Sequence, residues 1–383
     1  MSELTAQLLM IFPSLILAGD DGKRFSFILL VTILLVIMII DIQKQRKFST
    51  VLPGVLLLYL LFYESLRNLA FYSLSAPEWR DLGEMIRIVG VFCAFYIGAH
   101  SNPSIVSVRR IVVAFLCVNF ILLIEYVLNL QFLSIFYYEK ITRFSGTSVS
   151  INYVFAQIIF VAYLLRRYKM GNLIVLAFFI TSLGMLLFSG SRTSVLVSIP
   201  ILLVLISSRM SKSWILILII SSLLLIQRFD FLALDFDGVF RLYNTVQSII
   251  AGENSFSTFD KRIVNLQEIY NYAANSIWFG HGSNKSVYAT VDNTYIMTIY
   301  RYGLIGLALE LVFYIVSFAW IIRRSDDKIF NTLILASFFV AGLVSAVSYE
   351  LRASLVFFYL IGFMLPNSYR DAKVSSLRRG VVK

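Results

Sequence analysis

Two polar stretches between apolar runs contain arginine side chains that could hold a phosphate. Arg143 opens the stretch Arg-Phe-Ser-Gly-Thr at 143–147, and Arg192 lies within Ser-Gly-Ser-Arg-Thr-Ser at 189–194. A guanidinium is planar, stays charged at any working pH and can bind a phosphate bidentately. A simple polar turn is the alternative for 189–194. Because a charge so near an apolar run is costly without a partner, we favour a functional role for Arg192.

A third polar stretch combines a sharp turn with residues that could move a proton. Gly280 and Gly282 flank His281, and Asp292 and Asn293 directly precede an apolar run. His281 could act as a base or donate to a phosphate, and a histidine that caps a turn is an equal alternative. Asp292 could accept a proton from a substrate hydroxyl, or it could cap the following helix.

The composition indicates that these residues belong to a membrane protein. Of the 383 residues, 59% are hydrophobic and 14% are charged, with a mean hydropathy of +0.82. A soluble globular chain is about half apolar and about a quarter charged, so a cytosolic enzyme and a disordered protein are excluded. Cys93 and Cys117 lie in apolar runs, which argues against a disulfide framework. Glu3 and the lack of a basic region near the start predict no cleaved signal peptide.

Twelve apolar segments are candidates for membrane spans, because a spanning helix needs about 20 mostly apolar residues and at least about 17. We therefore expect an all-α polytopic membrane protein. The segment 293–322 is long enough to contain a short lead-in helix before the span. The candidates are 4–18, 25–41, 51–66, 84–100, 111–130, 151–165, 172–189, 193–207, 213–227, 293–322, 329–348 and 351–366.

The basic residues indicate how these spans are oriented. With the N-terminus in the cytoplasm, 18 of the 33 Lys and Arg residues fall in inner linkers and the C-terminal tail, together with five of the 22 acids. The outer side then has 15 basic and 15 acidic residues. The net charge of +11 thus reflects the positive-inside bias of short loops and does not indicate nucleic-acid binding. Both termini are expected in the cytoplasm.

One linker is much longer than the others and divides the chain. An N-terminal bundle of about nine spans at 1–227 precedes an outer loop at 228–292. About three further spans follow at 293–366, and a basic cytoplasmic tail occupies 367–383.

Within the long loop, residues 260–274 have the spacing of an amphipathic helix. Ile263, Leu266 and Ile269 lie on its apolar side, and Arg262 lies on its polar side. Such a helix could lie on the membrane or pack on the bundle near the outer ends of the spans. A passive surface loop is the alternative.

Arginine dominates the outer side, where it accounts for ten of the 15 basic residues when Arg24 and Arg87 are included. This set suits a lipid-linked pyrophosphate, although each arginine could instead pair with an acid or a lipid phosphate. The other eight are Arg67, Arg80, Arg143, Arg192, Arg241, Arg262, Arg301 and Arg352.

Two acids, Glu125 and Glu310, lie inside predicted spans, where ionisable residues are functional by default. Neither has a partner evident from the sequence. No group of histidines and carboxylates has metal-ligand spacing, and no phosphate-binding loop or serine-hydrolase elbow is present. We expect neither a metal ion nor a cofactor.

The order of these motifs resembles that of the O-antigen polymerases and the related O-antigen ligases of the bacterial envelope. An outer R-x-x-G-T at 143–147 and S-G-S-R-T-S at 189–194 precede a long outer loop. That loop contains an arginine-bearing helix and G-x-G, and D-N-T-Y at 292–295 and Y-G-L-I-G at 302–306 follow. The resemblance covers the whole chain in architecture.

This resemblance implies a metal-independent, inverting glycosyltransferase of the GT-C type in the bacterial inner membrane. Its donor and acceptor would be undecaprenyl-pyrophosphate-linked oligosaccharides at the periplasmic face. A polymerase moves the growing glycan onto a new lipid-linked repeat unit, whereas a ligase moves it onto lipid A core. Ligases usually have a histidine where this chain has Asp292, which favours the polymerase. A chain-length regulator and a flippase are further expected partners, besides membrane lipid.

The resemblance also assigns roles to individual residues. Arg192 and Arg262 match family arginines and are expected to bind the donor pyrophosphate, with Asp292 or His281 as base. The expected substrate-binding residues are Arg143, Arg241, Asn293, Tyr295 and Arg301. A lipid-linked oligosaccharide flippase is the rival interpretation, but the two similar halves typical of transporters are not found in this sequence.

Overall fold

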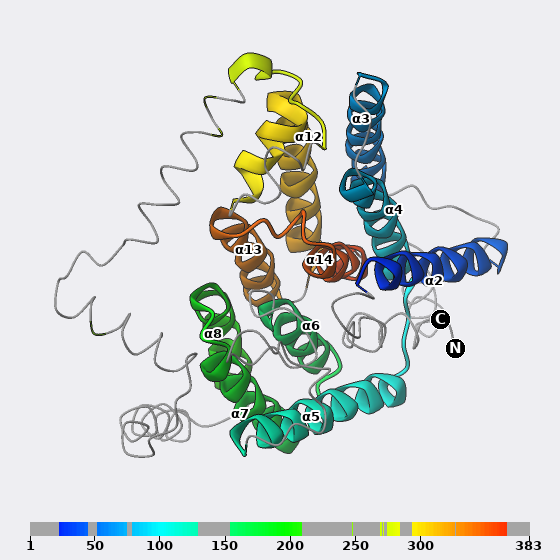
Figure 1. The fold of residues 1–383 in the computed structure, drawn as a ribbon. Helices are drawn as coiled ribbons and strands as arrows, with labels where there is room; N and C mark the ends of the chain where they lie inside the picture. Colours follow the sequence, from blue (N-terminus) through cyan, green and yellow to red (C-terminus); the bar gives the residue numbers. More distant parts are fainter. Residues whose placement is uncertain are drawn as a thin grey trace. The chain divides into compact units, whose positions relative to one another are not determined.

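The computed structural model describes residues 23–44, 52–74, 79–128, 154–208, 247, 269, 271, 274–283, 293–325 and 327–365. Across these residues the regular elements are helices, and no strand occurs (Figure 1). They are α2 (Lys23–Lys44), α3 (Leu52–Leu74), α4 (Trp79–His100), α5 (Ile105–Val127), α6 (Val154–Arg167), α7 (Asn172–Ser189), α8 (Arg192–Ser207), the 3₁₀ turn η6 (Ala274–Ser276), α12 (Thr294–Arg324), α13 (Lys328–Val344) and α14 (Leu351–Met364).

Short polar caps separate the apolar helices. Gly190 ends α7 in the left-handed conformation with φ 58°, and Ser191 then caps α8 by accepting a hydrogen bond from the Ser194 amide. Ser104 caps α5 in the same way. The stretch 189–194 is therefore the tight turn predicted from the sequence, with Arg192 as the first residue of α8.

The helices form two compact units that do not follow chain order. In one unit, α3 and α4 group with α12, α13 and α14, although the long loop separates them in the sequence. The most extensive helix pair in this unit is α4 with α14, and α3 packs on both α4 and α12. The other unit contains α5, α6, α7 and α8.

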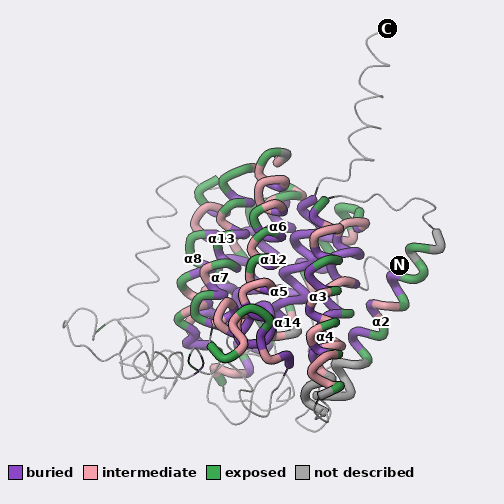
Figure 2. The backbone as a smooth tube through the Cα atoms, turned by 90° about the horizontal axis from the view of Figure 1, so that it is seen from above, coloured by how far each residue is buried: buried purple, intermediate pink, exposed green. Residues whose placement is uncertain are grey.

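In the first unit, α3 has polar residues inside and apolar residues outside. Tyr59 and Phe62 are each 63% exposed, whereas Glu64 and Asn68 are buried. Figure 2 shows buried and exposed residues sharing this helix. A soluble helix has the opposite arrangement, so α3 is suited to a surrounding of lipid.

In the second unit, α6 is enclosed by its neighbours. Every residue from Val154 to Leu165 is buried, and α6 contacts α5, α7 and α8. A helix that is hydrophobic all round belongs in the core of such a bundle.

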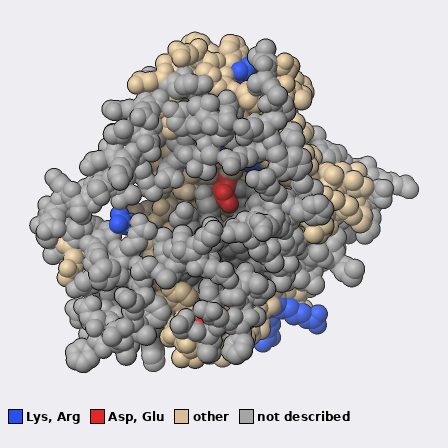
Figure 3. Space-filling model, viewed as in Figure 1, with Lys and Arg blue, Asp and Glu red and all other residues tan. Residues whose placement is uncertain are grey.

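Five helices of the described part are long and apolar enough to cross a membrane, and they lie within α3, α4, α5, α7 and α12. Shorter apolar helices occur in α2, α8, α13 and α14. On the face in Figure 3, the visible described residues are mostly neither acidic nor basic. These findings support a multi-pass membrane protein. The predicted number of twelve spans stays a prediction, because the candidates 4–18 and 213–227 lie outside the described residues.

Several helices are longer than the sequence predicted, α3 and α4 among them. The expected segments 51–66 and 84–100 correspond to α3, which ends at Leu74, and α4, which begins at Trp79. The expected segments already contained Glu64 and Arg87, and the first of them stopped short of Asn68, which is buried in α3. Asn68 donates to the Tyr302 hydroxyl at 3.3 Å, and such a partner lowers the cost of burying a polar side chain.

Candidate functional site

The helix α12 is broken at Gly303. Gly303 has φ 68° and ψ −171°, so a short helix from Thr294 precedes the main span. This confirms the lead-in helix predicted from the sequence. A break leaves backbone N–H and C=O groups without their helical partners, and such groups need other partners away from water.

The segment 276–283 supplies partners for the carbonyl groups before the break. The amide of His281 donates to the carbonyl of Tyr300 at 2.9 Å, and the amide of Gly282 donates to the carbonyl of Arg301 at 2.8 Å. The hydroxyl of Tyr63 on α3 donates to the carbonyl of Tyr302 at 2.9 Å. Three successive carbonyls are thus satisfied from outside the helix.

The same segment also accepts from the amide groups after the break. The amide of Leu304 donates to the carbonyl of Ile277 at 2.8 Å, and the amide of Ile305 donates to the carbonyl of Trp278 at 3.3 Å. Figure 1 shows the 274–283 segment beside the first turns of α12. The loop therefore replaces the hydrogen bonds that the helix loses.

This contact requires glycine on both sides. Gly280 has φ 68°, and a Cβ atom there would lie 2.4 Å from the carbonyl carbon and oxygen of Arg301. A Cβ atom at Gly303 would lie 2.2 Å from the carbonyl oxygen of Trp278. Arg67 on α3 holds the turn from outside, because its Nη2 donates to the carbonyl of Gly280 at 2.7 Å. The G-x-G motif at 280–282 is therefore the sharp turn that the sequence predicted.

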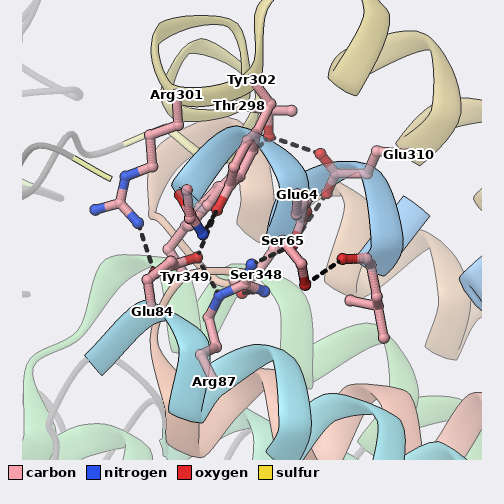
Figure 4. Close-up of polar contacts among 12 residues, drawn as sticks. Glu64, Ser65, Glu84, Arg87, Thr298, Arg301, Tyr302, Glu310, Ser348 and Tyr349 are labelled. Carbon is pink, nitrogen blue, oxygen red and sulfur yellow. Dashed lines mark hydrogen bonds and ion pairs between the residues drawn. The ribbon is translucent and has the colours of Figure 1, made fainter. Parts of the chain in front are cut away.

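A buried ion-pair network lies next to the break (Figure 4). Arg87 on α4 donates from Nε to Glu84 at 2.5 Å and from Nη2 to Glu64 on α3 at 2.6 Å. Its Nη1 donates to the carbonyl of Ser348 at 3.1 Å, in the linker between α13 and α14. All three groups of the Arg87 guanidinium thus have acceptors.

Glu84 connects this network to α12. Its Oε2 accepts from Nη1 of Arg301 at 2.7 Å, and its Oε1 accepts from the Tyr302 hydroxyl at 3.1 Å. Figure 4 shows Arg301 and Tyr302 extending from α12 toward Glu84. Both residues immediately precede Gly303. Arg301 is 1% exposed, and its Nε has no hydrogen-bond partner among the described residues.

The aromatic ring of Tyr349 contacts both guanidinium groups. The ring centroid lies 5.0 Å from Cζ of Arg87 and 4.8 Å from Cζ of Arg301, within the range of cation–π attraction. Burial and the carboxylates of Glu310 and Glu64 raise the pKa of the Tyr349 phenol well above its usual value. The phenol is therefore a neutral donor, and it donates to Thr298 at 2.8 Å.

Glu310, the intramembrane acid without an evident partner in the sequence, is surrounded by hydroxyl groups. It accepts from Thr298 and Tyr314, each at 2.6 Å, and from Ser348 at 3.2 Å. These partners come from α12 and from the linker before α14. The cluster therefore ties the α13–α14 linker to both sides of the helix break.

Three of the predicted site residues lie near the start of α12. His281 is half-buried, with its ring centroid 5.7 Å from that of Tyr300. Asn293 caps α12 by accepting from the Tyr295 amide at 2.9 Å and the Ile296 amide at 3.0 Å. Its amide nitrogen donates to Leu343 at 2.8 Å, and the Tyr295 hydroxyl donates to a carbonyl of α13 at 3.1 Å.

Arg301, predicted to bind substrate, lies in the same unit as these three residues. Its guanidinium forms an ion pair with the carboxylate of Glu84. Arg192 is exposed at the first position of α8 in the other unit. Glu125 is buried within α5. The predicted residues Arg143, Arg241, Arg262 and Asp292 lie outside the described residues.

Three residues of the expected amphipathic helix 260–274 are among the described residues: Ile269 is buried, and Asn271 and Ala274 are exposed. Ile269 is 2% exposed and packs with Met297 and Tyr300 of α12. Ile269 is one of the apolar positions on which the helix was predicted. Ile269 is therefore buried against the lead-in helix, where it packs on Tyr300, and the ring of His281 contacts the same tyrosine.

Sequence reasoning missed the network itself, namely Glu64 and Glu84 and the role of Arg87. The available signal was the i,i+3 spacing of Glu84 and Arg87, which places an acid and a base on one helical face. Among the described residues, no group of three or more His, Cys, Asp or Glu residues could hold a metal ion.

Residues 176–311 match a family model described as O-antigen ligase. The matched stretch contains Arg192, His281, Asn293, Tyr295 and Arg301. The match supports the O-antigen ligase and polymerase superfamily and does not separate the two activities. A search of curated proteins gives no match.

Replacement of Arg87 by methionine is expected to destabilise the protein strongly. The change leaves the carboxylates of Glu64 and Glu84 buried without their shared partner, a loss that typically costs about 3–5 kcal/mol. The measurement is the thermal unfolding midpoint of the purified protein in detergent. Arg109→Met is the control, because Arg109 is exposed on α5. Equal midpoints for the two variants would contradict the structural role of the network.

Proposed function

We propose that this chain is a membrane-embedded glycosyltransferase that polymerises a surface glycan. It transfers the growing glycan from undecaprenyl pyrophosphate onto the non-reducing end of a new lipid-linked repeat unit at the periplasmic face. The observation that carries the proposal is the family match, since the matched stretch contains most of the residues predicted to do this chemistry.

In this proposal, Arg192 and Arg262 bind the donor pyrophosphate, together with Arg143 and Arg241. Guanidinium groups stabilise the charge that develops on the pyrophosphate as the anomeric C–O bond breaks. Lipid pyrophosphate is a good leaving group, so the reaction needs no metal ion. The exposed position of Arg192 at the start of α8 is consistent with contact to a substrate.

The acceptor hydroxyl attacks the anomeric carbon from the face opposite the leaving group, and a base takes its proton. His281 and Asp292 are the candidates. The backbone amide of His281 donates to the carbonyl of Tyr300, and this hydrogen bond fixes the backbone from which the imidazole extends. Asn293 and Tyr295 follow Asp292 within three residues and support the start of α12. Arg301 is buried on Glu84, so we assign it a supporting role instead of direct contact with the donor.

A ligase is the second candidate, because the matched family model is described as O-antigen ligase. It would use the same donor and pass the glycan to lipid A core. Asp292 stands where ligases usually have a histidine, which favours the polymerase.

The purified protein is expected to lengthen lipid-linked glycan when it receives synthetic lipid-linked repeat units alone. Products of two or more repeats on the lipid carrier, resolved by mass spectrometry, would support the polymerase. A ligase would leave these units unchanged and would transfer glycan only after lipid A core is added. Absence of transfer in both mixtures would refute the proposed function.

Replacement of Arg192 or Arg262 by alanine is expected to shorten the chain-length ladder of surface polysaccharide to its first rung. Removal of a preorganised donor to a developing charge typically lowers the rate about 10²–10³-fold. Arg192→Lys keeps the charge but loses the planar fork, so it should restore only part of the ladder. Arg110→Ala, on the exposed side of α5, is the control. Ladders of normal length at normal protein levels would remove both arginines from the mechanism.

A further inference from the structure

Glu84 is the point at which the buried network contacts the broken helix. Its two carboxylate oxygens accept from Arg301 at 2.7 Å and from Tyr302 at 3.1 Å, and Glu84 is itself 1% exposed. A charge-assisted hydrogen bond is about twice as strong as a neutral one, and water does not weaken it at this depth. Glu84 therefore fixes the last two residues before Gly303.

Arg301 and the residue before it, Tyr300, hold the loop that contains His281. The carbonyl of Arg301 accepts from the Gly282 amide at 2.8 Å, and the preceding carbonyl, of Tyr300, accepts from the His281 amide at 2.9 Å. Side chains that anchor Arg301 and Tyr302 thus anchor the backbone that the turn binds. One continuous set of contacts runs from Glu84 through α12 to His281.

We propose that Glu84 is a positioning residue that holds the 280–283 turn, and with it His281, in the geometry needed for glycosyl transfer. This inference rests on the proposed function for its catalytic part. Glu84 does not touch the substrate; it acts through Arg301 and Tyr302. A displacement of about 1 Å at a reacting group can lower a rate about 10²-fold, so a carboxylate remote from the chemistry can control it.

The network contains a second buried acid, Glu64, that also pairs with Arg87 but is not connected to Arg301 and Tyr302. Glu64 is 4% exposed and pairs with Arg87 at 2.6 Å, as Glu84 also does. Within the described residues, Glu64 hydrogen-bonds neither Arg301 nor Tyr302, whereas Glu84 bonds both. Neutralising either acid removes one of the two negative charges that pair with Arg87. Only neutralising Glu84 removes the negative charge that Arg301 and Tyr302 share at the end of the lead-in helix.

The experiment compares Glu84→Gln with Glu64→Gln in full-length protein in lipid nanodiscs. Backbone hydrogen exchange of a peptide that covers 277–283 reports directly on the amides of His281 and Gly282. Exchange there should become about tenfold faster in Glu84→Gln, the equivalent of one lost charge-assisted hydrogen bond, and should stay unchanged in Glu64→Gln. Turnover of lipid-linked repeat units gives kcat and KM for the same samples.

In turnover, Glu84→Gln should lower kcat about 10²-fold with KM unchanged and should alter the pH dependence of kcat. Glu64→Gln should leave both as in the unchanged protein. Glu84→Asp keeps the charge and should recover part of kcat. A milder variant, Tyr302→Phe, removes the hydrogen bond to Glu84 and the one accepted from Asn68, and keeps the Arg301–Glu84 ion pair. It should change exchange and kcat in the same direction to a smaller extent.

Several results would overturn the inference. Equal exchange and equal kcat in the two glutamine variants would show that Glu84 has no special connection to the turn. Faster exchange with unchanged kcat would show that glycosyl transfer does not depend on the 280–283 turn being held in place by Glu84. If the unchanged protein transfers no glycan, the proposed function fails, and the exchange comparison alone then decides whether Glu84 holds the turn.

Discussion

The arrangement of the first unit depends on one constraint: backbone groups released by a break in a membrane helix must find partners without water. At Gly303 the helix α12 gives up its own hydrogen bonds, and the 276–283 loop replaces them from both sides of the break. Each unsatisfied group would cost several kcal/mol in hydrocarbon, so the loop and the break require each other. A broken helix is therefore also a means of fixing a loop, and this loop contains His281.

The buried charges are the second consequence of the same constraint. Glu64, Glu84, Arg87 and Arg301 would be costly in a membrane if they stood alone, and each has a partner of opposite charge. Their pairing allows α3 and α4 to remain helical through residues that a lipid-exposed helix would not tolerate. Apolar side chains of α3 such as Tyr59 and Phe62 are exposed, while the paired polar groups are buried within a largely apolar interior.

The sequence was sufficient for features that depend on local rules. Apolar length and the Ser-Gly-Ser turn predicted α7 at its observed bounds, the start of α8 within one residue, and the lead-in helix of α12. It was insufficient for the network, because Glu84 and Arg301 are 217 residues apart and no local pattern joins them. Hydropathy also shortened α3, since it treats a buried, hydrogen-bonded Asn68 like an exposed one. Arg301 is buried and paired with Glu84, and for this reason we assign it a supporting role in the proposed mechanism.

The most direct test of this account is an electron cryomicroscopy map of the protein in lipid nanodiscs, at a resolution that shows backbone carbonyls. We expect a helix interrupted at Gly303, with the His281 and Gly282 amides within hydrogen-bond distance of the carbonyls of Tyr300 and Arg301. A helix that continues unbroken through Gly303, with the 280–283 turn away from it, would contradict the account.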